Sequence, residues 1–422
     1  SDAGGFGADG SESVVKCGTF TTDGTSKATV TLGWEPQYFL VKSRDIAQDW
    51  EVWDTMRGLN NTTVGRLRPN LSSAEDYHLM ASPTATGIDI KALSASQPYI
   101  YMAIRRPMKT PTAGTEVYTT IARAGNNVTT QIPTGFTTDM FLSATRNQTW
   151  YHDAVWDRLR GTSKFVITST TGAEQGNTAQ FTSFDQDGIT VGPDSSGWIN
   201  NAGATYVYNL FKRATGFMDV VAYTGNGTAG ATQAHNLGVV PEMLIVKRRN
   251  ATDLWPVYHA TLGNTKYIQL NSDVPEGAWS GTWNNTTPTA SVFSLGSGSY
   301  TNASSSTYVA YLFATLAGIS KVGSYTGTGS SLNVDCGFTG GARFILIRRY
   351  NYPSGESDWY TWDSVRGISA GSNDPYLLLN DSAVEVTNTD YVDPLNAGFT
   401  VTSNASSTVN VNGGTYIFLA IA

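Results

Sequence analysis

The sequence has few charged residues. Asp, Glu, Lys and Arg make up 14% of its 422 residues, whereas about 25% is usual in soluble domains. A helix-rich or coiled-coil protein needs far more Glu, Lys, Ala and Leu, so the composition excludes that class. The net charge of −7 provides no basic surface for nucleic acid and no attraction to an anionic membrane. We therefore expect no nucleic-acid binding and no membrane insertion.

Cysteine and histidine are also scarce. The two cysteines, Cys17 and Cys336, are too few for a disulfide scaffold or a zinc cage, so we expect two unpaired thiols. The four histidines form no His-Glu-x-x-His pattern, and the sequence predicts no metal site and no cofactor. No stretch approaches 18 apolar residues and no charged leader precedes an apolar run. We therefore expect no membrane span and no signal peptide.

One short segment occurs four times at nearly constant spacing. The copies are Val52–Gly58, Val155–Gly161, Val257–Gly263 and Thr361–Gly367. Their aromatic residues stand at positions 53, 156, 258 and 362, with an apolar run before each copy and an aromatic-led run after it. The chain is therefore predicted to contain four copies of one domain of about 100 residues, each large enough for its own core.

The predicted organisation is a Gly-rich leader at 1–15 followed by repeats 1 to 4 at 16–108, 109–214, 215–317 and 318–422. Within a repeat, runs such as Lys27–Leu32 alternate polar and apolar residues, as a half-buried strand does. Turn formers such as Gly225–Gly227 separate about six or seven runs per repeat. The predicted fold class is all-β, with four tandem β-sandwich, jelly-roll-like domains.

The repeated segment places a carboxylate beside a guanidinium, which would suit acid–base catalysis. Three copies hold both residues, as Asp54/Arg57, Asp157/Arg160 and Asp363/Arg366. The remaining copy has lost both together, and His259 and Leu262 stand in their places. Joint loss is typical of a structural ion pair, because one charge left alone at a partly buried site costs more than losing both. We predict three structural ion pairs, no catalytic residue and no enzymatic activity.

Specific function is expected among residues that do not repeat. Trp279 and Trp283 lie with Asn284 in a polar, Gly-broken segment, and Trp198 is another tryptophan outside the repeated positions. Flat rings among Asn, Ser and Thr suit the faces of sugars. The alternative interpretation is that the rings close an end of the sandwich or contact a neighbouring repeat. The predicted ligand-binding residues are Trp198, Trp279, Trp283 and Asn284. A tryptophan stands three residues before the repeated aromatic residue in repeats 1, 3 and 4, but Trp150 stands six residues before Trp156. This local insertion marks a further candidate.

Several segments together resemble a repeated domain of structural proteins of tailed bacteriophages, of the kind found in phages of marine bacteria and cyanobacteria. They are Tyr223–Thr228, His235–Met243, Leu244–Arg248, Ser183–Gly192, Ala204–Val207 and the Asp-x-x-Arg-Gly motif. Repeat 1 departs from this pattern at Arg66–Pro69, which leaves its strand order open.

The resemblance implies a virion protein at the particle surface, such as a tail fibre, spike or capsid-surface fibre. It would assemble with other virion proteins, form a homo-oligomer such as a trimer, and attach to host-surface glycans. Two alternatives stay open. One is an enzyme that cuts surface polysaccharide with two carboxylates about 5–10 Å apart, and the other is a decoration or scaffold protein without a ligand.

Overall fold

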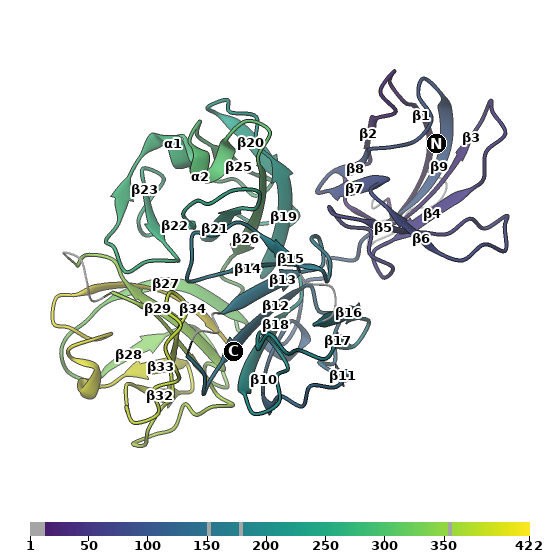
Figure 1. Ribbon diagram of the computed structural model, residues 1–422. Coiled ribbons are helices and arrows are strands. Elements are labelled where there is room, and N and C mark those ends of the chain that lie inside the picture. The colour runs from purple at the N-terminus through teal and green to yellow at the C-terminus, as the bar shows by residue number, and fades with distance from the viewer. Residues whose placement is uncertain (1–12, 150–152, 177–179, 353–356) are drawn as a thin grey trace. The chain divides into compact units, whose positions relative to one another are not determined.

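The computed structural model describes residues 13–149, 153–176, 180–352 and 357–422 (Figure 1). It is nearly all β, and the pairings between its named strands are antiparallel. The only helices among these residues are the short α1 (Ser280–Trp283) and α2 (Ser299–Asn302) and the 3-10 turns η1 (Gly114–Glu116) and η2 (Ser403–Ala405). The all-β prediction is confirmed. Most of the predicted leader lies outside the described residues, and the first strand begins at Val15.

Repeats 1 and 2 contain nine described strands each. Those of repeat 1 are β1 (Val15–Thr21), β2 (Ala28–Thr31), β3 (Pro36–Ser43), β4 (Glu51–Asp54), β5 (Val64–Arg66), β6 (Asp76–His78), β7 (Ala81–Thr84), β8 (Gly87–Ile90) and β9 (Pro98–Arg105). Those of repeat 2 are β10 (Tyr118–Ala124), β11 (Thr130–Ile132), β12 (Met140–Thr145), β13 (Ala154–Asp157), β14 (Lys164–Ile167), β15 (Gln175–Gly176), β16 (Phe181–Asp185), β17 (Gly188–Val191) and β18 (Thr205–Phe211).

Repeats 3 and 4 contain eight described strands each. Those of repeat 3 are β19 (Met218–Thr224), β20 (Ala231–Ala234), β21 (Met243–Arg248), β22 (Pro256–His259), β23 (Lys266–Gln269), β24 (Gly277–Ala278), β25 (Val292–Leu295) and β26 (Thr307–Phe313). Those of repeat 4 are β27 (Ser320–Thr326), β28 (Leu332–Asp335), β29 (Phe344–Arg349), β30 (Trp359–Asp363), β31 (Leu377–Leu378), β32 (Val392–Leu395), β33 (Gly398–Val401) and β34 (Thr415–Ile421). The sequence predicted fewer strands because two-residue strands are too short to show alternation.

The main sheet has the same strand order in every repeat. Its central strand is the aromatic-led run at the end of the repeat, which pairs on one side with the first strand and on the other with the long apolar strand. The orders begin β1-β9-β3-β4, β10-β18-β12-β13, β19-β26-β21-β22 and β27-β34-β29-β30. Repeat 1, whose order the sequence left open, therefore follows the common pattern.

A second, smaller sheet faces the main sheet across an aromatic core. In repeat 2 the second sheet is β11-β17-β16. Phe184 and Ile189 from this sheet share one buried cluster with Phe141, Trp156 and Tyr208 from the main sheet. Two sheets that contribute alternate side chains to one core form a β-sandwich.

The described chain divides into two compact units. The first comprises 1–108 with 158–161, and the second comprises 109–157 with 162–422. Repeats 2, 3 and 4, apart from 158–161, therefore pack together as a single unit. Their main sheets meet at a common centre (Figure 1).

Equivalent residues from the three repeats surround that centre. Leu142, Ile245 and Leu346 hold the same position on β12, β21 and β29 and line a buried apolar cavity of about 60 Å³. Both faces of these strands are consequently buried, which explains their continuously apolar sequences. Three equivalent strands of one chain thus border this centre.

Candidate functional site

The junctions between repeats involve the residue three positions before the repeated aromatic residue. The backbone N–H groups of Thr168, Leu270 and Leu379 donate to the carbonyl oxygens of Asp153, Trp255 and Trp359 at 2.9–3.0 Å. This shared hydrogen bond shows that Asp153, Trp255 and Trp359 occupy the same position. Repeat 2 therefore has a carboxylate where repeats 3 and 4 have an indole.

The two indoles join neighbouring repeats. The Nε1–H of Trp255 donates to the carbonyl of Thr170 in repeat 2 at 3.1 Å. The Nε1–H of Trp359 donates to the carbonyl of Gln269 in repeat 3 at 2.8 Å. Both side chains are at most 1% exposed, so the junctions exclude water from these bonds.

A buried cation lies over each of these indoles. The Nζ of Lys247 lies 5.8 Å from the ring centre of Trp255, and the guanidinium of Arg348 lies 5.8 Å from that of Trp359. Burial lowers the pKa of Lys247 to about 8 and that of Arg348 to about 10. Lys247 also donates to the carbonyl of Thr171 at 2.9 Å. The cation and the indole together form a clamp that holds the preceding repeat.

The junction between repeats 4 and 2 lacks this clamp. Ala144 stands at the position of the cation and packs against Val207 and Leu377. Asp153, at the position of the indole, is 4% exposed, and its Oδ2 has no hydrogen-bond partner among the described residues. Burial raises the pKa of this carboxyl well above its usual range. A protonated, neutral carboxyl suits an apolar position better than a carboxylate.

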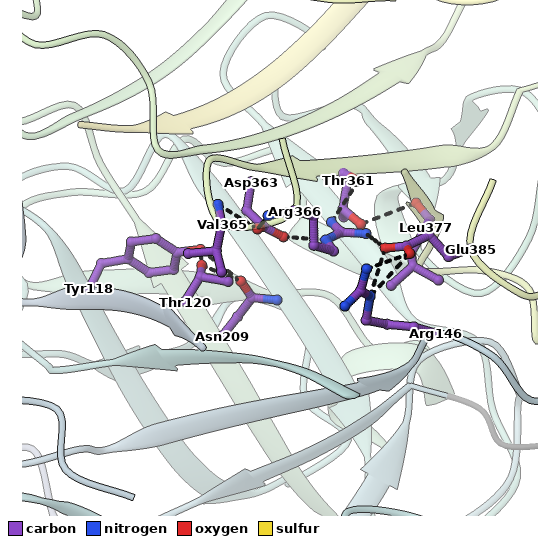
Figure 2. Close-up of polar contacts among 10 residues, drawn as sticks. All are labelled: Tyr118, Thr120, Arg146, Asn209, Thr361, Asp363, Val365, Arg366, Leu377 and Glu385. Atoms are coloured by element: carbon purple, nitrogen blue, oxygen red, sulfur yellow. Dashed lines mark hydrogen bonds and ion pairs between the residues drawn. The ribbon is translucent and has the colours of Figure 1, made fainter. Parts of the chain in front are cut away.

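A chain of ion pairs replaces the clamp at this junction (Figure 2). Glu385 of repeat 4 pairs with Arg146 of repeat 2 at 2.9 Å and with Arg366 at 3.2 Å. Arg366 also binds Asp363 at 2.5 Å. The side chains of Asp363, Arg366 and Glu385 are at most 5% exposed. Burial by itself would lower the pKa of Arg366, but the charges of Asp363 and Glu385 together outweigh burial, so the pKa is raised.

The other copies of the Asp–Arg motif lie in different surroundings. Asp54 and Arg57 form a partly exposed pair at 2.5 Å. Asp157 and Arg160 are fully buried, and the hydroxyl of Tyr311 in repeat 3 donates to Asp157 at 2.9 Å. The motif residues of repeats 2 and 4 are thus buried parts of the fold, as a structural role requires.

Repeat 3 keeps the motif position uncharged. Burial lowers the pKa of His259 to about 4, so its imidazole is neutral at pH 7. Leu262 beside it is buried. The neutral pair avoids the cost of one unbalanced buried charge.

Trp283 requires a correction, because it is 2% exposed and lies in the core of repeat 3. Its ring packs edge-on against Tyr258 at 6.0 Å, as Phe181 packs against Trp156 at 5.9 Å in repeat 2. The larger indole at 283 compensates for the smaller phenol at 258. No comparison of single positions reveals such an exchange between two distant residues.

Trp279, in contrast, lies at the surface and is 42% exposed. Its ring rests on the backbone of Gly281 and Gly298, where an added Cβ would lie within 2.4 and 2.2 Å of ring atoms. Tyr300 packs edge-on against it at 4.9 Å, and Tyr267 packs against Tyr300 at 5.8 Å. We call Trp279, Tyr300 and Tyr267 the aromatic platform.

The other predicted ligand-binding residues are not part of the aromatic platform. Trp198 is half-buried and packs against Phe165 at 5.1 Å. Asn284 ends α1 with a left-handed backbone (φ 54°), and its N–H donates to the carbonyl of Ser280. The Trp150 candidate lies outside the described residues.

Tyr300 and the clamp cations were not predicted from the sequence. Tyr300 lies in the short helix α2, seven residues before β26 begins, without a repeated motif to mark it. Lys247 and Arg348 end the apolar runs of repeats 3 and 4, and a charged residue that ends two equivalent core strands was the available signal.

The sequence matches a family described as a domain of unknown function, DUF7483, over residues 113–422. The chain belongs to the DUF7483 family. The matched segment coincides with repeats 2 to 4, which is the set that packs as one unit. No curated protein matches the sequence.

Other features of the described residues bear on particular classes of site. No helix among them is long and apolar enough to cross a membrane. No group of three or more His, Cys, Asp or Glu side chains within these ranges is arranged to hold a metal ion. Cys17 is exposed and Cys336 buried, and both are free thiols.

Proposed function

We propose that this DUF7483 protein is a structural attachment protein that binds carbohydrate at the aromatic platform of repeat 3. The exposed indole of Trp279 is the observation that carries the proposal. Glycine backbone supports one side of the ring, so the ring is fixed in place before a ligand arrives. A pre-oriented ring loses little conformational entropy on binding.

The chemistry around the platform suits a sugar. The CH groups of a pyranose can stack on the open part of the indole, while Tyr300 and Tyr267 contribute hydroxyl groups for hydrogen bonds. Ser280 next to Trp279 is exposed and adds a further short polar side chain. Few side chains need to be ordered, because the aromatic rings already pack against one another.

The location on a phage particle rests on the resemblance of the repeated segments to virion structural proteins. The protein would then be a tail fibre, spike or capsid-surface component that contacts other virion proteins, assembles as a homo-oligomer and touches host-surface glycans. The packing of three repeats into one compact unit supports a load-bearing role, because buried junctions resist separation of the repeats. Immunogold imaging of intact particles tests this location.

A glycan array probed with the full chain tests the binding function. For the glycans that the unaltered protein binds, we expect Trp279→Ala to lower the affinity of the protein at least about tenfold. Stacking on an indole supplies a large share of such binding. The matched control is Tyr77→Ala, which removes another exposed aromatic ring, 62% exposed, from repeat 1.

Three outcomes would contradict the proposal. Unchanged binding in Trp279→Ala would exclude the platform as the site. Release of reducing ends from host polysaccharide, abolished by one Asp or Glu substitution, would favour the polysaccharide-degrading enzyme instead. Absence of binding to every glycan tested would favour the scaffold protein.

A further inference from the structure

A groove on repeat 3 lies at a different place from the aromatic platform. It has a volume of about 510 Å³, within the range of about 300–1,000 Å³ that is typical of small-molecule sites. Its apolar wall includes Val239 and Val240, which are 37% and 45% exposed. Glu242, Tyr258 and Thr287 contribute polar groups to the lining.

Glu242 carries a negative charge that the protein does not neutralise. Its Oε2 accepts a hydrogen bond from the backbone N–H of Thr315 at 2.5 Å. The ion pairs of repeat 3 in the described part of the chain use Asp219, Asp253, Glu276 and, from repeat 2, Glu174 as acids, and none includes Glu242. The carboxylate is therefore available to a cation from outside the chain.

The residue at the position of Glu242 differs between the repeats. The backbone N–H of Glu242 donates to the carbonyl of Phe313, and that of Arg343 donates in the same way to Ile421 in repeat 4. Repeat 4 thus has a cation where repeat 3 has an acid. Repeat 2 has Asp139 at this position, with its N–H donating to Phe211, but Asp139 is buried whereas Glu242 is half-buried. Repeat 3 is also the copy in which the motif arginine is replaced, by Leu262. The motif position of repeat 3 is uncharged, so Glu242 is the charged residue among those that line the groove.

The tyrosine at the base of the groove is electrostatically linked to Glu242. Tyr258 replaces the tryptophan of the other three repeats and is the only one of the four aromatic residues with a hydroxyl group. Burial, and next the charge of Glu242, raise the pKa of its phenol. The phenol is therefore protonated at neutral pH and can donate or accept a hydrogen bond.

We propose that this groove binds an amino sugar with a free ammonium group. The ammonium would pair with Glu242, the ring CH groups would contact Val239 and Val240, and hydroxyl groups would reach Tyr258 and Thr287. Several polar partners around an apolar wall fit a pyranose better than a lysine side chain, which presents one ammonium on a narrow stem. The site is separate from the aromatic platform and does not depend on it.

Saturation-transfer NMR with the full chain tests the proposal. The probes are a β-1,4-linked glucosamine trisaccharide, its fully N-acetylated counterpart and Nα-acetyl-lysine methylamide. We expect binding of the glucosamine trisaccharide and at least about tenfold weaker binding of the other two. Glu242→Gln should lower the affinity for the glucosamine probe at least about tenfold. The amide oxygen of the new glutamine can still accept the hydrogen bond from the backbone N–H of Thr315. The melting temperature of this variant should stay unchanged.

The control variants separate this site from its alternatives. Glu276→Gln removes a repeat 3 acid that already pairs with Lys266, and it should leave the affinity within twofold. Trp279→Ala should also leave it unchanged. If Trp279→Ala abolishes glucosamine binding and Glu242→Gln does not, the groove proposal is wrong and the platform stands. Equal binding of the N-acetylated probe, or preference for the lysine derivative, also overturns it.

Discussion

The indole N–H of Trp359 donates a hydrogen bond to the carbonyl oxygen of Gln269, 2.8 Å away in the preceding repeat. The guanidinium of Arg348 covers the same ring. Trp255 and Lys247 repeat this arrangement one junction earlier. These two buried tryptophans therefore join one repeat to the next.

Trp359→Ala is expected to lower the stability of the unit formed by repeats 2 to 4 by about 3–5 kcal/mol. The substitution removes a buried indole and leaves the carbonyl of Gln269 without its donor. Trp50→Ala is the matched control, because the backbone N–H groups of Trp50 and Trp359 donate to Asn70 and Asn380 in the same way. Trp50 is only half-buried, so a smaller loss is expected. Chemical denaturation followed by fluorescence measures both, and equal losses would contradict a junction role.

Arg366→Leu should destabilise the protein by about 3–5 kcal/mol, because it leaves Asp363 and Glu385 as buried acids with one partner fewer. Adding Asp363→His imitates repeat 3 and should recover part of the loss. Recovery should be incomplete, since Glu385 keeps only Arg146. Arg57→Leu, at the partly exposed pair, should cost about 1 kcal/mol or less. A double-mutant cycle in urea measures the coupling, and simple additivity would refute the ion-pair interpretation.

Tyr258→Trp should overpack the core of repeat 3 and cost about 1–3 kcal/mol. Trp283→Phe alone should also destabilise, because it opens a cavity and removes the indole N–H that donates to Lys266. The double variant recreates the Trp156/Phe181 pair of repeat 2. The free energy of unfolding of the double variant should be at least about 1 kcal/mol higher than the sum of the two single effects predicts. Thermal unfolding of the four proteins tests this exchange, which fails if the effects add.

The Asp153 carboxyl is expected to make stability depend on pH. Its folded-state pKa is raised by burial, so the folded protein keeps a proton that the unfolded chain releases above about pH 4. Its contribution is therefore fully present below the unfolded pKa and is lost as pH rises toward the folded pKa. Asp153→Asn should remove this loss. Denaturation of both proteins between pH 4 and 8 should show a difference that grows with pH, and a constant difference would argue against a buried protonated acid.

Alternation and spacing were sufficient to predict the longer strands of each repeat. Lys27–Leu32 contains β2, and the apolar runs before the motif copies of repeats 2 to 4 lie within β12, β21 and β29. These predictions succeeded because a strand's side chains alternate between its faces, so the apolar pattern reports burial directly. The small strands and helices were missed, since two to four residues give no readable period.

Candidate site residues were harder to predict. Trp279 and Trp283 stand four residues apart in similar polar surroundings, yet one is exposed and the other is in the core. The difference arises because Tyr258 leaves room for an indole at 283, whereas Gly281 and Gly298 hold the ring of Trp279 at the surface. Both causes are contacts between distant parts of the repeat.

By itself, the amino-acid sequence determined an all-β chain with one motif repeated four times, because side-chain periodicity and residue spacing are local properties. Tertiary structure alone decided that repeats 2 to 4 close around a common apolar centre, and that one of the three junctions relies on Arg146, Glu385 and Arg366 rather than on a cation and an indole. Periodicity identifies an apolar face, but only the folded chain shows which neighbour covers that face.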